Sequence, residues 1–98
     1  MTIQHTVVFS LTHSAGTPQE TAFLADGRAA LTSIPGVSDF VISRQVSAKS
    51  DFDFQFSMQF NDQDDYDAYN VHPAHVAFVE SRWVTEVTAF QEYDFVTL

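Results

Sequence analysis

Two histidines and a tyrosine fall within seven positions of the stretch YNVHPAHVAF, residues 69–78, with a proline between the histidines. The chain has only four histidines, so half of them lie here. Imidazole titrates near neutral pH and can act as a general acid or base. Tyr69 precedes His75 by six positions, and its hydroxyl could donate a hydrogen bond to a developing oxyanion. The plainer interpretation is that His72 caps a helix, His75 bonds to a carbonyl and Tyr69 only packs.

Two further polar residues could join this group. His5 lies between Ile3 and Val7 on the apolar face of an expected strand, where a buried ring must find a partner or line a cavity. Asp94 lies between aromatic residues near the end of the chain. We expect His5, Asp94 and His75 to converge, with the carboxylate fixing the tautomer of a histidine ring and raising its basicity. The alternative for Asp94 is a solvated acid at a sheet edge.

The elements that would position these residues follow from hydrophobic periodicity. Alternation of apolar and polar residues predicts strands over residues 3–12, 37–46, 52–60 and 88–96. The third strand has the clearest pattern, since FDFQFSMQF places Phe and Met on one side and Asp, Gln and Ser on the other. The turn SAKSD predicts a hairpin between the second and third strands.

Helical signals lie between the outer pairs of strands. Thr17, Pro18 and Glu20 form a start signal, and Pro35-Gly36 ends the first helix. A second, acidic helix starts at about residue 61, breaks at Pro73 and continues to about residue 85. The resulting β-α-β-β-α-β order is the ferredoxin-like arrangement, an α+β fold whose antiparallel sheet carries helices on one face.

Composition narrows the class of protein. No linker-like stretch divides the 98 residues, so we expect residues 1–98 to form a single domain. The ten Phe and the bare face of the expected sheet predict a homodimer. A net charge of −9 argues against nucleic acid, and no apolar run approaches the ~20 residues of a membrane span. Without a signal-peptide pattern at the start, we expect a soluble, cytoplasmic protein.

No metal or organic cofactor is expected. The chain has no Cys, and His72 with His75 lacks both a third ligand and the spacing of a zincin motif. The acidic stretch DQDD lacks the Gly and Glu that a calcium loop requires. Three Gly in the whole chain provide no glycine-rich nucleotide loop.

Four segments, QHTVVFSL, SIPGVSDF, YNVHPAHVAF and the closing YDF, together resemble the stress-responsive α/β-barrel domain family, the Dabb proteins. The resemblance spans nearly the whole chain, and HPAHV is its most specific part. It implies ferredoxin-like protomers whose sheets pair into a dimeric α+β barrel.

Within this family, the pattern is similar to that of plant olivetolic acid cyclase, a cofactor-independent polyketide cyclase. The similarity implies that Tyr69 and His75 are catalytic, that Asp94 orients His75 and that His5 belongs to the pocket. The cyclase has a third-strand histidine where this chain has Phe54. The pocket here is therefore expected to be more apolar, and the same substrate is not implied.

The resemblance also predicts a mechanism. His75 would remove a proton from an acidic C–H between two carbonyls, and Tyr69 would hydrogen-bond the enolate. The expected residues of the substrate pocket are Phe9, Phe54, Phe56, His72 and Phe78. Two alternatives stay open: a cofactorless monooxygenase, and a non-catalytic ligand-binding or stress-protective dimer in which the histidines are structural.

Overall fold

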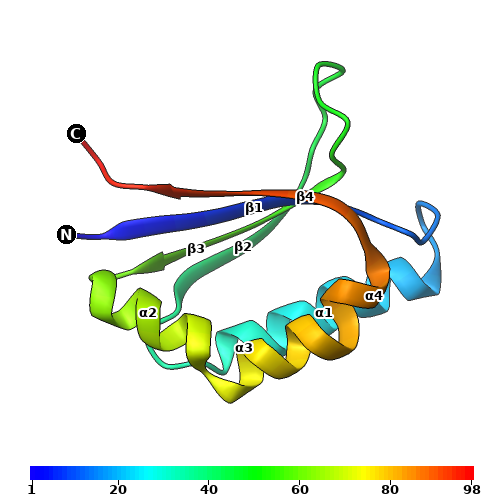
Figure 1. Ribbon diagram of the computed structural model, residues 1–98. Coiled ribbons are helices and arrows are strands. Elements are labelled where there is room, and N and C mark those ends of the chain that lie inside the picture. The colour runs from blue at the N-terminus through cyan, green and yellow to red at the C-terminus, as the bar shows by residue number, and fades with distance from the viewer.

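A computed structural model describes all residues from 1 to 98, and it has the expected ferredoxin-like α+β order (Figure 1). A π-helical segment, η1, interrupts the second helical region, which otherwise follows the expected course. The elements are β1 (Ile3–Leu11), α1 (Pro18–Thr32), β2 (Ser38–Arg44), β3 (Phe54–Phe60), α2 (Gln63–Val71), α3 (Pro73–Phe78), η1 (Val79–Trp83), α4 (Val84–Glu86) and β4 (Val87–Phe95).

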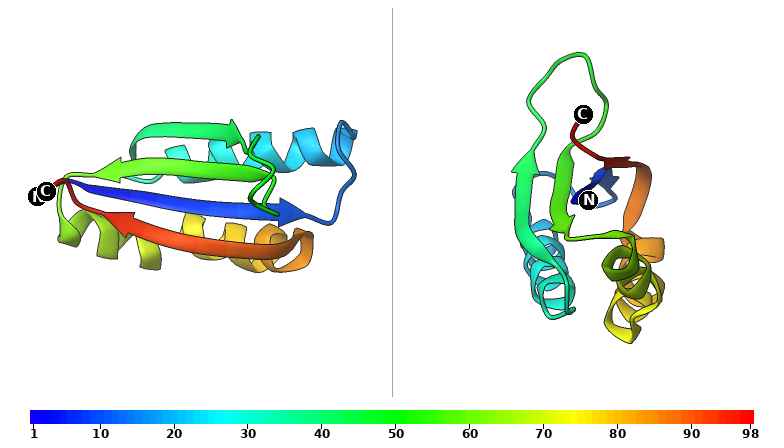
Figure 2. Two further views of the ribbon diagram at one scale, coloured as in Figure 1. Left: turned by 90° about the horizontal axis from the view of Figure 1, so that it is seen from above. Right: turned by 90° about the vertical axis from the view of Figure 1, so that its left-hand side faces the viewer.

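The four strands form one antiparallel sheet in the order β2-β3-β1-β4. All helices cover the same face of this sheet, and the opposite face is bare (Figures 1 and 2). The first and last strands are neighbours, and their register places His5 directly opposite Asp94. Opposite residues of a strand pair point to the same face, so both side chains lie on the helical side.

Local capping signals fix the helix starts. The Thr17 side chain accepts a hydrogen bond from the Glu20 backbone N–H at 3.3 Å, as the expected cap requires. The Glu20 carboxylate accepts from the Gly16 N–H at 3.4 Å instead of completing a capping box with Thr17. Asp62 caps α2 in the same way, accepting from Asp65 N–H at 2.9 Å.

The second helical region is not one helix with a single kink. Pro73 ends α2 and starts α3, as the sequence predicts, but the chain then widens into the π-helical η1 before the short α4. A π turn holds more residues than an α turn and displaces the side chains that follow it. Trp83 closes this turn and packs on the core rings of Phe9 and Phe23, with ring centroids 5.0 and 6.2 Å apart.

The core lies between the sheet and the helices and is dominated by phenylalanine. Phe9, Phe23 and Phe56 are fully buried, and their rings pack at centroid distances of 4.7 to 6.4 Å. Gly27 of α1 allows the helix to approach this cluster, because a Cβ at that position would lie only 2.8 Å from Cζ of Phe56. The glycine that weakens the helix is therefore required by the packing.

The bare face of the sheet carries exposed apolar side chains. Val41, Tyr93 and Phe95 are each about half exposed, at 50, 45 and 50%. The β2–β3 connection, residues 45–53, projects beyond this face (Figure 1). Phe52 belongs to that connection, so β3 begins two residues later than predicted. None of the helices is long and apolar enough to cross a membrane.

Candidate functional site

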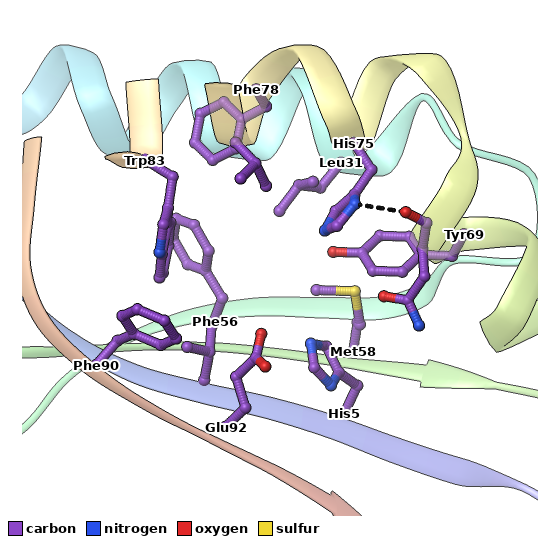
Figure 3. A pocket seen from close by; sticks show the side chains of 13 residues that line it. His5, Leu31, Phe56, Met58, Tyr69, His75, Phe78, Trp83, Phe90 and Glu92 are labelled. Atoms are coloured by element: carbon purple, nitrogen blue, oxygen red, sulfur yellow. Dashed lines mark hydrogen bonds between the residues drawn. The ribbon is translucent and has the colours of Figure 1, made fainter. Parts of the chain in front are cut away.

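A cavity of about 290 Å³ lies between the sheet and the helical layer formed by α1, α2, α3 and η1 (Figure 3). Its volume is close to the lower limit for small-molecule sites. Nine of the 13 lining residues are hydrophobic. His5, Tyr69 and His75 gather toward one end, and Glu92 lies nearer the middle (Figure 3). The cavity therefore has an apolar end and a polar end.

Tyr69 and His75 form the helical side of the polar end. Tyr69, on α2, is only 2% exposed, and its hydroxyl points into the cavity (Figure 3). Burial raises the pKa of this hydroxyl above its usual value, so it keeps its proton. The His75 ring lies beside it on α3, with ring centroids 4.5 Å apart. Burial lowers the pKa of His75, which favours the neutral imidazole.

A backbone carbonyl orients His75. Nδ1 of His75 lies 3.1 Å from the carbonyl oxygen of Asn70, and because a carbonyl can only accept, this nitrogen carries the proton. The carbonyl is available because of the break at Pro73. In a continuous helix it would accept from the Ala74 N–H, but that N–H donates to Nδ1 of His72 at 3.1 Å.

His5 forms the sheet side of the polar end and is paired with a carboxylate. Its ring is 4% exposed, and Nδ1 lies 2.6 Å from Oδ1 of Asp94. The hydroxyl of Tyr66, on α2, donates to the other oxygen of Asp94 at 3.0 Å. This bond and burial raise the pKa of Tyr66 to about 12, with burial the larger cause. A carboxylate bound on both oxygens holds the His5 ring in one orientation.

The two imidazoles consequently share one protonation pattern. In each ring, Nδ1 donates to a fixed acceptor, which leaves Nε2 as the site of the free lone pair in the neutral form. Neither Nε2 has a protein partner, and both rings line the cavity. Figure 3 shows His5 rising from the sheet toward Tyr69 and His75, which descend from the helices. The arrangement can transfer protons and stabilise a developing oxyanion.

The other end of the cavity is aromatic. Trp83 of η1 and Phe90 of β4 meet edge to face, with ring centroids 5.6 Å apart. Phe56 and Phe78 complete this end. Glu92, two residues after Phe90 on the same face of β4, directs its carboxylate into the cavity between the two ends (Figure 3).

Of the residues predicted from the sequence, Tyr69, His75, His5, Phe56 and Phe78 all line the cavity. Three expected pocket residues do not. Phe9 and Phe54 are instead buried in the core, at 0 and 3% exposure. Neighbouring core side chains pack around both rings, so neither ring reaches the cavity. His72 caps α3, which matches the plainer interpretation of that residue.

The expected pairing of Asp94 with His75 is not formed. Asp94 bonds to His5 because the β1–β4 register places these two residues opposite each other. His75 is instead oriented by the Asn70 carbonyl. Asp94 does not line the cavity and contacts it only through the His5 ring.

Sequence reasoning missed Glu92, Trp83 and Tyr66. Glu92 lies on the same face of β4 as Phe90 and Asp94, so a correct assignment of the two faces would have identified it. Aromatic residues occur on both faces of β4, and the sequence alone therefore does not show which face is buried. Trp83 reaches the cavity through the π turn, which the apolar periodicity does not reveal. Tyr66 lies three positions before Tyr69 on α2, a spacing that places both rings near one face of a helix.

The sequence profile of the stress-responsive A/B barrel domain family, Dabb, matches residues 3–97. This chain belongs to the Dabb family. A Dabb protein with a ferredoxin-like fold from Mesorhizobium loti is 50% identical to it, with a TM-score of 0.98 over 99% of this chain and 97% of that one. No curated protein matches this Dabb protein significantly.

More distant solved structures share its fold. Hydroxynitrile lyase from Passiflora edulis is 12% identical, with a TM-score of 0.85 over 99% of this chain and 94% of that one. SnoaB, a cofactor-independent oxygenase from Streptomyces nogalater, is 15% identical, with a TM-score of 0.73 over 98 and 92%. Several other similar structures are described as dimeric ferredoxin-like proteins. At such identities the likeness concerns the fold alone.

Proposed function

We propose that this Dabb protein performs cofactor-independent acid–base chemistry on a small carbonyl compound, of the cyclase or aldol-type lyase kind. The supporting observation is that two imidazoles with free Nε2 atoms and one protonated tyrosine line the same largely apolar cavity. These are the groups needed to remove a proton beside a carbonyl and to stabilise the enolate that results.

His75 is the general base in this proposal. Its lowered pKa keeps the ring neutral at neutral pH, and the Asn70 carbonyl holds Nδ1–H so that Nε2 accepts the proton. The Tyr69 hydroxyl donates to the substrate oxygen as negative charge develops there. The largely apolar lining of the cavity lowers the local dielectric constant, which strengthens both interactions.

His5 is the second proton-transfer group. The Asp94 carboxylate orients its ring through Nδ1, so Nε2 of His5 can take up a proton from the substrate and return it to another atom. This assigns Asp94 a positioning role through His5. A site with two proton carriers on opposite walls suits a reaction in which a proton leaves one atom and another atom is protonated.

The proposal is tested by proton exchange, which needs no knowledge of the natural substrate. Ethyl benzoylacetate has an aromatic end and an acidic C–H between two carbonyls, and its exchange in D₂O is followed by proton NMR. The protein is expected to accelerate exchange at pD 6 to 7. His75→Gln should abolish that acceleration, and Tyr69→Phe should lower it about 100-fold, the usual effect of losing one oxyanion donor.

The matched control is His13→Gln. His13 bonds to Glu86 at 2.6 Å outside the cavity, so removing this imidazole should leave exchange unchanged. Circular dichroism and the urea midpoint show whether each variant stays folded. Exchange that persists at the native rate in folded His75→Gln would contradict the assignment of the base.

We also propose that the protein is a homodimer joined through the bare face of the sheet. Val41, Tyr93 and Phe95 are half exposed there, and similar structures are described as dimeric. Light scattering after gel filtration should give twice the chain mass of 11.0 kDa. Val41→Lys with Tyr93→Lys should shift the mass toward the monomer, because buried unpaired charge is costly. A native monomer would refute the proposal.

A further inference from the structure

The cavity lining contains no Lys or Arg, although the chain has four such residues. Arg82 is held by Glu86 and Asp26 and does not line the cavity. Arg28 and Arg44 each lie over a phenylalanine ring that does not line the cavity, at 5.6 and 5.1 Å from its centroid. Lys49 lies in the β2–β3 connection. The cavity therefore offers an anionic ligand no permanently charged cationic side chain.

The one ionisable acid of the cavity lining is Glu92. Its carboxylate points into the cavity and has no hydrogen-bond or ion-pair partner in the protein. The chain as a whole carries a net charge of −9, which adds to the negative potential at the cavity. An anion entering here is repelled, and a cation is attracted.

Aromatic rings stand beside this carboxylate. Trp83 and Phe90 meet at an interplanar angle of 77°, so they present differently oriented faces to the same space. Phe56 lies behind them, 6.3 Å from the Trp83 centroid. Ring faces attract organic ammonium ions, and tryptophan is the strongest of them. A carboxylate next to such rings supplies the countercharge.

We propose that the cavity selects small organic cations, with an ammonium group held between the Glu92 carboxylate and the rings of Trp83 and Phe90. A substrate of this class would carry its carbonyl group toward Tyr69 and His75. The inference shares the cavity with the proposed function and names its substrate class, but it concerns binding and does not require turnover.

Choline and 3,3-dimethylbutan-1-ol form a matched pair of probes, because they have the same shape and differ in charge. Trp83 is the only tryptophan of the chain and lines the cavity, so its fluorescence reports occupancy. In titrations at constant ionic strength, choline should bind about tenfold more tightly than the neutral alcohol. Equal binding, tighter binding of the alcohol or no binding of choline would overturn the proposal.

Glu92→Gln isolates the countercharge. The substitution should weaken the binding of choline about threefold and leave the binding of the alcohol unchanged. In the native protein, the difference in affinity between choline and the alcohol should shrink with added salt. Glu80→Gln is the control, since it removes the same charge from an exposed position of η1 outside the cavity. An equal effect of both variants would contradict a local role for Glu92. Choline binding to His75→Gln should persist, which separates this proposal from a failure of the catalytic one.

Discussion

Replacing Gly27 by alanine tests how closely α1 packs on the wall of the cavity. A Cβ at this position would lie 2.8 and 3.0 Å from two ring atoms of Phe56 and 3.2 Å from Cζ of Phe78. Phe56 is fully buried between Phe9 and Phe23, so its ring has little freedom to move away. The new methyl group therefore overpacks the core.

Two opposing effects, helix propensity and overpacking, determine the expected change in the free energy of unfolding. Alanine in a helix interior is favoured over glycine by about 1 kcal/mol. Overpacking a filled core costs about 1 to 3 kcal/mol. We expect Gly27→Ala to lower the free energy of unfolding by about 1 kcal/mol. The displaced Phe56 and Phe78 rings also line the cavity, so ligand binding should weaken as well.

Urea denaturation followed by circular dichroism measures the change in the free energy of unfolding. Ala29→Gly provides the scale for helix propensity, because Ala29 is exposed on the same helix, and it should destabilise by about 1 kcal/mol. If Gly27→Ala instead stabilised the protein by that amount, the close approach of α1 to Phe56 would be refuted.

Two further predictions concern ionisable groups. The folded pKa of His75 lies below 6.5, so the unfolded chain binds more protons between the two values, and stability should fall as pH drops from about 6.5 through the folded pKa. His75→Gln should flatten the pH dependence of the urea midpoint in that window, and an unchanged slope would contradict the burial of the ring. The raised pKa of Tyr66, about 12, depends in part on the Asp94 carboxylate. Asp94→Asn should therefore lower the pKa of Tyr66, measured by ultraviolet titration, relative to the native protein. An unchanged titration curve would count against the hydrogen bond between Tyr66 and Asp94.

The strand and helix order follows from the sequence because local signals and periodicity agree. The alternation of β1 places His5 on the helical face, and Thr17 and Pro73 mark the helix boundaries that the structure has. These features depend on residues close together in the chain. The family resemblance rests on the same segments, and it is confirmed over residues 3–97.

The hydrogen-bond partner of Asp94 could not be predicted from local sequence signals. Whether that carboxylate reaches His5 or His75 depends on the β1–β4 register and on the distance between the sheet and α3, which are tertiary quantities. The orientation of His75 likewise depends on the Asn70 carbonyl, which the helix break leaves free to accept. The position of Trp83 depends on the π turn. Such backbone details have no signature in apolar periodicity.

We expect His5 and His75 both to present an unprotonated Nε2 to the cavity beside Tyr69. Long-range ¹⁵N–¹H correlation spectra of the imidazoles at about pH 8 read the tautomer of each ring directly, and His5→Gln and His75→Gln assign the signals. We predict the Nδ1–H tautomer for both rings, because the Asp94 carboxylate and the Asn70 carbonyl can only accept. An Nε2–H tautomer in either ring would contradict it.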